Sequence, residues 1–431
     1  MNLVARDKKV IWHPLTQHQT AVLPVPMVRG KASYLYDENG KSYLDLVSSW
    51  WVNLHGHCQP DIAEAIYQQA MTLEHVIFTG YTHQPAVELA EKICEILPKE
   101  LSRVFYSDNG STSTEVALKM AYQYWRNQGD TKRKRFMAFE QGYHGETIGG
   151  MSLNRNQTYH THFFDLMFPV DLFSYPATWI DDATALEKED NVLKQIANYL
   201  EKYGDETVAI ILEPLIQGPG GMNMCTPRFL QSLEKLIRSY GILIIYDEVM
   251  TGFGRTGEYF ACLKANTVPD IICVSKGITG GFLPLAATIC QEKIFEAFLG
   301  DSFGKAFTHS HSYTANPLGC AAGIASLELL VQSRKQRQLI EKIHHKNLLM
   351  LNEIPGVERT RYCGTIAAFD LSLGDYASTD SLRMQKKFIE RGLLLRPLGS
   401  VIYFLPPYCI TEAELTSAYE IVIEEIQGVL A

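Results

Sequence analysis

An aspartate and a lysine each follow an apolar segment with the length of a buried strand. Asp247 comes directly after residues 242–246, and Lys276 closes a similar segment at residues 271–275, 29 positions after Asp247. A buried carboxylate needs a cationic or hydrogen-bonding partner, whereas a lysine at a strand end can simply extend its ammonium group to solvent. Because ligands of open α/β sheets bind beyond the carboxyl ends of the strands, both residues are candidates for one site.

Two further strand ends carry groups that could bind a ligand. Gly110 and Ser111 stand where a predicted strand passes into a predicted helix, which suits a phosphate and equally suits an ordinary helix N-cap. Tyr143 and His144 follow another apolar segment and are flanked by glycines. Alone, His144 is as consistent with a structural role as with a functional one. Together, a phosphate cradle, an aromatic platform, a strand-end aspartate and a strand-end lysine predict a site for pyridoxal 5′-phosphate.

Each charged residue would have a defined task toward that cofactor. The amine of Lys276 would form a Schiff base with the cofactor aldehyde. The carboxylate of Asp247 would pair with the protonated pyridine nitrogen and keep the ring cationic. A dinucleotide fingerprint (GxGxxG after the first strand) and a phosphate loop (GxxxxGK[ST]) are both absent, and the histidines in "HSHS" and "HGH" lack the spacing of zinc ligands. No metal is predicted.

Composition narrows the class of protein. The chain of 431 residues has a formal net charge of −9, which argues against a nucleic-acid or anionic-membrane partner. No apolar run approaches the ~20 residues that span a bilayer, and the N-terminal residues lack the apolar region of a secretion signal. The nine cysteines form no CxxC pair, which is typical of reduced thiols. These features predict a cytoplasmic protein.

Apolar strands and helical patterns alternate along most of the chain. They predict an α/β fold with a largely parallel sheet covered on both faces. An Asn39-Gly40 turn predicts a hairpin over residues 34–46. The expected division is a large domain over residues 55–325, a smaller α+β domain over residues 326–431, and an N-terminal segment over residues 1–54 that packs with the smaller domain. The strands expected in the large domain lie at residues 103–108, 135–140, 208–214, 242–247, 271–276 and 285–290.

Residues 244–281 resemble the signature of class III, fold type I, pyridoxal-phosphate aminotransferases, in which the aspartate, the GFGRTG turn and the lysine recur in this order and spacing. Segments such as "SSWWVNLHGH", "GYHGET" and "LLLRPLGSVIYFLPPY" extend the resemblance over nearly the whole chain. It implies a large domain with a mostly parallel seven-stranded sheet and a smaller α+β domain built from both termini. Within the family, the chain is similar to the members that aminate 8-amino-7-oxononanoate to 7,8-diaminononanoate in biotin biosynthesis.

The resemblance implies a role for each matching residue. Lys276 would hold the cofactor and move the proton, Asp247 would hold the pyridine nitrogen, and Tyr143 would stack on the ring. The cofactor phosphate would be bound by Gly110 and Ser111 and, from the neighbouring subunit of a homodimer, by His311 and Ser312. The substrate pocket would be formed by Leu15, Trp50, Trp51, Tyr143, Glu146, Arg255, Lys276, Ser310 and Arg396. In this pocket Arg396 would pair with the terminal carboxylate of the substrate, a task suited to a guanidinium group.

The amino donor is the least determined part of this interpretation. Leu15 and Glu146 stand where the S-adenosylmethionine-using members have tyrosine and aspartate, and some relatives use lysine instead. We expect S-adenosylmethionine, because the rest of the pocket matches that subgroup. Two other functions stay open: an aminotransferase for another ω-amino acid such as 4-aminobutyrate or ornithine, and a catalytically inactive homologue that binds or regulates. Trp50 and Trp51 favour a long apolar acceptor, and the presence of both Lys276 and Asp247 disfavours an inactive protein.

Overall fold

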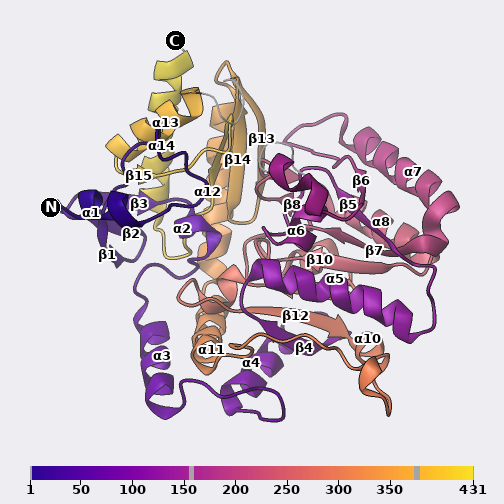
Figure 1. Cartoon of the computed structure of the whole chain (residues 1–431). Coiled ribbons are helices and arrows are strands. Elements are labelled where there is room, and N and C mark those ends of the chain that lie inside the picture. The colour runs from indigo at the N-terminus through magenta and orange to yellow at the C-terminus, as the bar shows by residue number, and fades with distance from the viewer. Residues whose placement is uncertain (1, 155–159, 373–378, 431) are drawn as a thin grey trace.

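The computed structural model describes residues 2–154, 160–372 and 379–430, and its largest sheet has seven strands (Figure 1). The strands lie in the order β4-β12-β11-β10-β7-β5-β6. Their bounds are β4 (Leu101–Ser107), β5 (Arg135–Phe139), β6 (Asp171–Phe173), β7 (Thr207–Leu212), β10 (Leu243–Asp247), β11 (Ile271–Val274) and β12 (Ala286–Gln291). β12 is antiparallel to both of its neighbours, and the pairs among the other strands are parallel. The predicted α/β fold with a mostly parallel sheet is confirmed.

The side chains of β10 alternate between two apolar layers. Leu243 and Ile245 belong to the layer under α5 (Gly110–Asn127), which Figure 1 shows in front of the sheet. Ile244 and Tyr246 belong to the layer that includes the apolar face of α8 (Pro227–Ser239). Because helices cover both faces, every residue of this strand is buried. This is why the sequence shows a continuous apolar run here instead of alternation with polar residues.

The remaining elements of this part of the chain precede, connect or follow the strands of the large sheet. They are α3 (Pro60–Thr72), α4 (Gln84–Glu95), α6 (Ile148–Ser152), η1 (Thr161–Leu166), α7 (Ala185–Tyr203), η2 (Gly204–Glu206), β8 (Ile216–Gln217), β9 (Asn223–Met224), α9 (Ala261–Ala265), η3 (Lys276–Thr279), α10 (Glu292–Glu296), η4 (Phe303–Lys305) and α11 (Pro317–Gln332). Pro60 and Pro227 each stand at the start of a helix, where the missing N–H removes no hydrogen bond. Over the described ranges, no helix combines the length and apolar character needed to cross a membrane.

The two ends of the chain meet in a second group of elements, at the upper left of Figure 1. One sheet has the order β1-β2-β3-β15, in which β15, from the C-terminal part, runs parallel to β3. The other sheet has the order β13-β14-β16. The elements of this group are α1 (Leu3–Val10), β1 (Met27–Lys31), β2 (Tyr34–Asp37), β3 (Ser42–Asp45), α12 (Arg334–Asn352), β13 (Val357–Cys363), β14 (Ile366–Leu371), α13 (Thr379–Glu390), β15 (Leu393–Leu394), β16 (Val401–Phe404) and α14 (Glu412–Leu430). We propose that this group and the large sheet form the two domains divided near residues 55 and 326.

Several strand bounds differ by one or two residues from the predicted ones, and the difference at β11 matters most for the site. β11 ends at Val274, two residues earlier than expected, and Lys276 opens the short 3₁₀ helix η3 with a positive φ of 46°. The chain turns here because the Ser275 hydroxyl donates to the carbonyl of Leu285, 2.8 Å away, at the start of the next strand. The sequence also gave no indication of β6, whose three residues are too few for a periodic signal.

A left-handed turn, α2 (Ser48–Trp51), follows β3. Its four residues have φ values of 49°, 47°, 80° and 72°, and none of them is glycine. Each such residue costs about 1–2 kcal/mol relative to the right-handed conformation. The turn is held by backbone hydrogen bonds from Trp51 and Val52 to the carbonyls four residues before them. Strain of this kind persists only where the surroundings compensate for it, and it is concentrated at functional sites.

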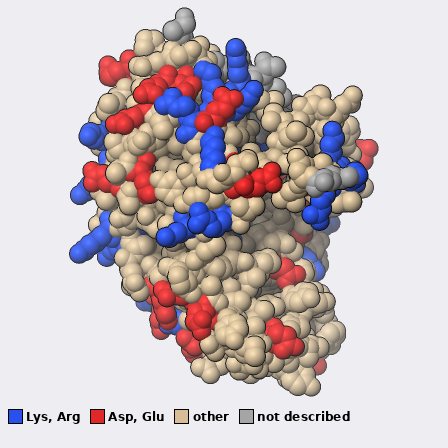
Figure 2. Space-filling view, turned by 90° about the vertical axis from the view of Figure 1, so that its left-hand side faces the viewer, with Lys and Arg blue, Asp and Glu red and all other residues tan. Residues whose placement is uncertain are grey.

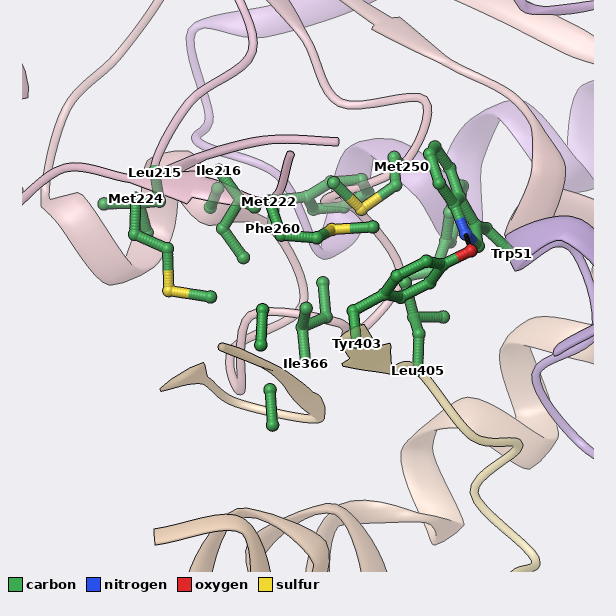
Figure 3. Packing of buried hydrophobic residues seen from close by; sticks show 14 of the residues in the cluster. Trp51, Leu215, Ile216, Met222, Met224, Met250, Phe260, Ile366, Tyr403 and Leu405 are labelled. Atoms are coloured by element: carbon green, nitrogen blue, oxygen red, sulfur yellow. Dashed lines mark hydrogen bonds between the residues drawn. The ribbon is translucent and has the colours of Figure 1, made fainter. Parts of the chain in front are cut away.

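The large sheet and the second group share an apolar contact next to this turn (Figure 3). Trp51 and Tyr403 point toward each other, and the indole N–H of Trp51 donates to the Tyr403 hydroxyl at 3.0 Å. Met222 and Met250 from the large sheet's loops belong to the same buried cluster.

Basic and acidic side chains are interspersed on the surface seen in Figure 2.

Candidate active site

A cavity of about 660 Å³, which we call the inner cavity, lies beyond the carboxyl ends of β7 and β10. It brings together the four polar groups that the sequence had placed at separate strand ends. Its lining includes Asn109, Gly110, Ser111, Thr112, Tyr143, His144, Gly145, Glu146, Glu213, Asp247, Val249, Ser275 and Lys276. This is the position at which open α/β sheets bind ligands.

One end of the inner cavity is the N-terminus of α5. Asn109 caps the helix by accepting from the N–H of Thr112 at 3.1 Å. In a helix, the N–H groups of the first positions have no intrahelical acceptor, so those of Gly110 and Ser111 are available to an anion. A Cβ on Gly110 would approach Val249 Cγ1 to 2.8 Å, and one on Gly145 would collide with Ser111 Oγ. The glycines therefore leave room for this narrow cradle.

Asp247, which also lines the inner cavity, is buried and hydrogen-bonded. Its Oδ2 lies 2.8 Å from Nδ1 of His144, and its Oδ1 accepts from the N–H of Val249 at 3.1 Å. His144 is only 2% exposed. The imidazole fixes the orientation of the carboxylate, as histidine–carboxylate pairs do in other polar sites. The sequence did not decide between a structural and a functional role for His144. Its pairing with Asp247 could not be predicted, because the two residues are 103 positions apart in the sequence.

A second carboxyl group, Glu213, was missed by the sequence analysis. It follows β7 directly and accepts two backbone hydrogen bonds of 2.9 Å, from the N–H groups of Tyr143 and Gly218. Burial raises its pKa to about 7. Glu213 thus fixes the loop that carries Tyr143, and the signal for it was the Glu-Pro pair at the end of an apolar strand.

Lys276 faces the inner cavity from the start of η3. Burial lowers its pKa to about 8, and the carboxylates of Asp247 and Glu213 oppose that shift. A lowered pKa increases the fraction of neutral, nucleophilic amine near neutral pH. Its Nζ also lies 4.6 Å from the centroid of the Trp51 ring. The lysine is therefore placed and tuned for covalent chemistry with a carbonyl group.

The inner cavity fits pyridoxal 5′-phosphate. The helix N-terminus with its two cradle glycines suits the phosphate, and the buried Asp247 carboxylate suits a cationic pyridine nitrogen. Lys276 and Tyr143 line the same cavity. Burial and the neighbouring Glu146 carboxylate raise the pKa of the Tyr143 phenol, which therefore stays protonated near neutral pH.

A smaller cavity of about 340 Å³, the outer cavity, meets the inner one. Tyr143, Glu146, Pro219 and Lys276 line both. The lining of the outer cavity also includes Leu15, Ser49, Trp50, Trp51, Asn154, His160, Leu394, Leu395, Arg396 and Tyr403. The guanidinium carbon of Arg396 lies 4.3 Å from the centroid of the Trp50 ring. The outer cavity is therefore a mainly apolar slot lined by one lysine and one arginine.

Glu146 takes part in a polar chain along the wall of the outer cavity that the sequence did not indicate. Its Oε2 lies 3.2 Å from Nε2 of His160, and Nδ1 of the same ring lies 3.1 Å from Oδ1 of Asn154. Asn154 in turn donates to the carbonyl of Gly142. Glu146 is thus fixed beside Tyr143 although it is itself exposed.

Arg255 does not line either cavity. It is 1% exposed, and its guanidinium donates to the carbonyls of Pro406 at 2.8 Å and Asn53 at 3.2 Å. Arg255 connects the GFGRTG turn to segments from both ends of the chain, and its contact with substrate stays a prediction. A single sequence gives no sign of which buried carbonyls an arginine will reach.

Ser310, His311 and Ser312 lie outside both cavities of their own chain, all of whose lining residues are described. His311 instead lies 3.6 Å from the carboxylate of Asp108, and its Nε2 is 2.9 Å from that of His309. The segment is exposed or partly exposed at these positions. The other predicted site residues, including Leu15, Trp50, Trp51 and Arg396, are brought together around the two cavities.

Comparison with known proteins agrees with this site. Residues 15–426 match the family described as Aminotransferase class-III, and the chain belongs to that family. It is 50% identical over 411 residues to the adenosylmethionine-8-amino-7-oxononanoate aminotransferase of Synechococcus elongatus, covering 95% of this chain and 96% of the relative. The protein of the same name from Geobacter sulfurreducens is 40% identical, with 95% and 94% covered.

Solved structures give the same result. The adenosylmethionine-8-amino-7-oxononanoate aminotransferase of Methanocaldococcus jannaschii superposes with a TM-score of 0.92 at 36% identity, covering 99% of this chain and 98% of that one. An amine transaminase from an uncultivated Pseudomonas species, in its pyridoxal-phosphate-bound form, superposes with a TM-score of 0.90 at 28% identity, covering 97% and 99%. The fold is that of the fold type I aminotransferases.

Proposed function

We propose that this aminotransferase uses pyridoxal 5′-phosphate to convert 8-amino-7-oxononanoate to 7,8-diaminononanoate in biotin biosynthesis. The observation that carries the proposal is the outer cavity, an aromatic slot lined by both Lys276 and Arg396. A nine-carbon acceptor with a reacting ketone toward one end and a carboxylate at the other suits such a slot. The names of the relatives at 50% and 40% identity support the same reaction.

The residues of the inner cavity divide the chemistry of the cofactor among them. When bound, the cofactor supplies the electron sink that stabilises negative charge on the reacting carbon. Asp247 keeps the pyridine nitrogen protonated, and His144 orients the Asp247 carboxylate through the 2.8 Å contact. Gly110 and Ser111 bind the phosphate, and the ring of Tyr143 lies along one face of the site.

Lys276 moves the proton. Its amine, with a pKa lowered to about 8, can accept a proton from the reacting carbon of the donor and later return one to the acceptor. Trp51 lies against the same amine and reduces the access of water to it. The two steps share one pocket, because an aminotransferase binds first the donor and then the acceptor.

Arg396 binds the terminal carboxylate of the acceptor. Replacing it with alanine is expected to raise the KM for 8-amino-7-oxononanoate by roughly 10- to 100-fold, because hydrogen bonds to charged groups contribute about 1.5–3 kcal/mol each. The donor half-reaction should change much less. Single-turnover kinetics of the two half-reactions measure the difference.

The matched control for that change is Arg359→Ala. Arg359 is an exposed arginine of β13, 3.6 Å from Asp370, and lines neither cavity. It should leave both half-reactions unchanged. An equal loss in the donor and acceptor half-reactions of Arg396→Ala would instead assign Arg396 to the structure of the pocket.

We propose S-adenosylmethionine as the amino donor. Glu146 keeps the negative charge that a sulfonium cation needs, although it is one methylene longer than aspartate, and its contact with His160 holds it at the pocket. Leu15 lines the outer cavity and offers only apolar contact. Lysine is the competing donor, and other ω-amino acids, such as 4-aminobutyrate and ornithine, would point to a different aminotransferase.

A single-turnover screen separates these donors. S-adenosylmethionine is expected to bleach the visible absorption of the bound cofactor within the turnover time, whereas lysine, ornithine and 4-aminobutyrate should leave it nearly unchanged. Leu15→Tyr is the matched variant and should increase the rate with S-adenosylmethionine if a hydroxyl at this position helps to orient the donor. Rapid bleaching by lysine alone would assign the donor to lysine.

The active unit proposed here is a homodimer with its active sites at the subunit interface. His311 and Ser312 would reach the cofactor phosphate of the neighbouring subunit, and Ser310 would border its substrate pocket. Their position outside the cavities of their own chain supports this arrangement.

A cytoplasmic location is also proposed, supported by nine cysteines that are all free thiols.

A further inference from the structure

Two consecutive tryptophans face the two cations of the outer cavity. The ring of Trp51 lies 4.6 Å from Nζ of Lys276, and the ring of Trp50 lies 4.3 Å from the guanidinium carbon of Arg396. Adjacent residues of a strand would point to opposite faces. The left-handed turn α2 instead directs both rings into the outer cavity. The backbone conformation of its four residues therefore determines the positions of the two tryptophan rings that line this cavity.

Asp45, the last residue of β3, holds this turn. Its Oδ1 accepts from the N–H groups of Val47 and Ser49, both at 3.1 Å, and its Oδ2 accepts from the Ser49 hydroxyl at 3.0 Å. The residue is fully buried and lines neither cavity. Of the three hydrogen bonds that this carboxylate accepts, two come from Ser49, a left-handed residue, and one comes from Val47, which directly precedes the left-handed residues.

A buried polar network fixes Asp45 in turn. Nε2 of His57 lies 2.9 Å from the Asp45 carboxylate, and Nδ1 of the same ring lies 3.2 Å from the amide nitrogen of Asn53. Arg255 donates to the carbonyl of Asn53 at 3.2 Å. Because His57 accepts from Asn53 at Nδ1, its Nε2 carries the proton that it donates to Asp45. The network connects the turn to the GFGRTG segment through Arg255.

We infer that Asp45 is a positioning residue that sets the chain-length selectivity of the outer cavity by holding the left-handed Ser48–Trp51 turn. The inference deepens the proposed function, on which it rests. The reacting carbon must lie at Lys276 and the carboxylate at Arg396, so the length of acceptor that fits is the separation of those two groups. Trp51 lies beside Lys276 and Trp50 lies beside Arg396. If the turn lost its support and changed conformation, the two rings would move, and shorter acceptors would bind nearly as well as 8-amino-7-oxononanoate.

The test is Asp45→Asn in the full-length holoenzyme. The asparagine amide has a single accepting oxygen. At the Oδ1 position it leaves the Ser49 hydroxyl and His57 without their acceptor, and at the Oδ2 position it leaves the N–H groups of Val47 and Ser49 without theirs, so the turn loses part of its support in either orientation. The measured quantity is the ratio of kcat/KM for 8-amino-7-oxononanoate to that for its homologue two methylenes shorter. We expect this ratio to fall about tenfold, because pocket walls discriminate by roughly 10- to 200-fold per methylene. Near-UV circular dichroism of the apoenzyme should change as the two tryptophans reorient.

Two further variants distinguish a specific effect on the Ser48–Trp51 turn from a nonspecific loss of folded structure. Asp45→Asn combined with Ser49→Gly should recover most of the lost selectivity, because glycine adopts positive φ without steric cost. The matched control is Asp37→Asn in the neighbouring strand. Asp37 is also a buried carboxylate that accepts from two backbone N–H groups and a hydroxyl, but it holds the Asn39-Gly40 turn, away from both cavities. It should leave the ratio and the tryptophan signal unchanged.

The possible results distinguish this inference from the proposed function. An unchanged ratio and an unchanged tryptophan signal in Asp45→Asn would overturn the inference, as would a loss that Ser49→Gly does not recover. If Asp45→Asn fails to fold, His57→Gln tests the same support and should shift the ratio in the same direction by a smaller factor. A wild-type enzyme that does not turn over 8-amino-7-oxononanoate would overturn the proposed function, whereas the circular dichroism of the apoenzyme would still test the turn.

Discussion

Replacing Lys276 with alanine is expected to reduce turnover by at least about 10⁴-fold, because the change removes both the covalent attachment and the proton-transferring group. The structure leaves no nearby substitute: the polar groups that share the inner cavity with Lys276 are carboxyl, carboxamide, hydroxyl, imidazole and backbone groups, and no second lysine lines it. Any cofactor that binds to the variant should be held by non-covalent contacts alone. Steady-state assays at high enzyme concentration would measure the residual rate.

Two measurements make this prediction specific to Lys276. Lys276→Arg keeps a cation beside Trp51 but lacks the nucleophilic amine, so it should be as inactive as the alanine variant. Borohydride reduction of the wild-type holoenzyme followed by peptide mapping should place the pyridoxyl group on Lys276. The exposed Lys99 offers a control: Lys99→Ala should retain full activity and the same labelled peptide. A label on another lysine would disprove the assignment.

The strands around the active site could be predicted because each is a local pattern. The buried strand β10 is continuously apolar from Leu243 to Tyr246 and ends at Asp247, and a similar apolar run marks β7 and β11. Parallel order then follows from the alternation with helices. These local signals sufficed to place Asp247, Lys276 and the α5 N-terminus at one edge of a sheet before any contact was known.

The contacts between distant segments could not be predicted in the same way. His144 meets Asp247 across 103 residues, and Arg255 donates to Pro406 across 151. Such pairs depend on how distant parts of the chain pack against one another, and local sequence patterns do not determine that packing. The polar chain from Glu146 to Asn154 through His160 has the same origin.

The left-handed turn was unpredictable for a different reason. The sequence Ser-Ser-Trp-Trp contains no glycine, asparagine or aspartate, which are the residues that usually mark positive φ. Its conformation is imposed by the Asp45 carboxylate and by the Ser48 hydroxyl, which donates to the carbonyl of Leu405 at 2.7 Å. Local propensity and the observed backbone disagree here, and that disagreement falls at the wall of the substrate pocket.

Asp247 and Asp270 are two buried aspartates at opposite ends of neighbouring strands. Substituting each of them in turn distinguishes an effect on turnover from an effect on stability. Asp247 ends β10 and faces the inner cavity. Asp270 precedes β11, accepts from the N–H of Ile244 at 2.8 Å, and pairs with Arg238 and Lys293 on the far side of the sheet from the cavity. Loss of charge at the two positions should therefore have different consequences, because only one of them faces the cofactor.

Asp247→Asn is expected to lower kcat by about 10²–10³-fold, the cost of removing one group that stabilises charge in the transition state. Asparagine can still contact His144 and accept from Val249, so the fold should be retained. Asp270→Asn should do the reverse, lowering Tm while the folded enzyme keeps its turnover. Thermal unfolding and single-turnover rates of both variants measure the contrast. Near-normal turnover in Asp247→Asn would show that the pyridine nitrogen does not need this carboxylate, and the role would pass to another group of the inner cavity.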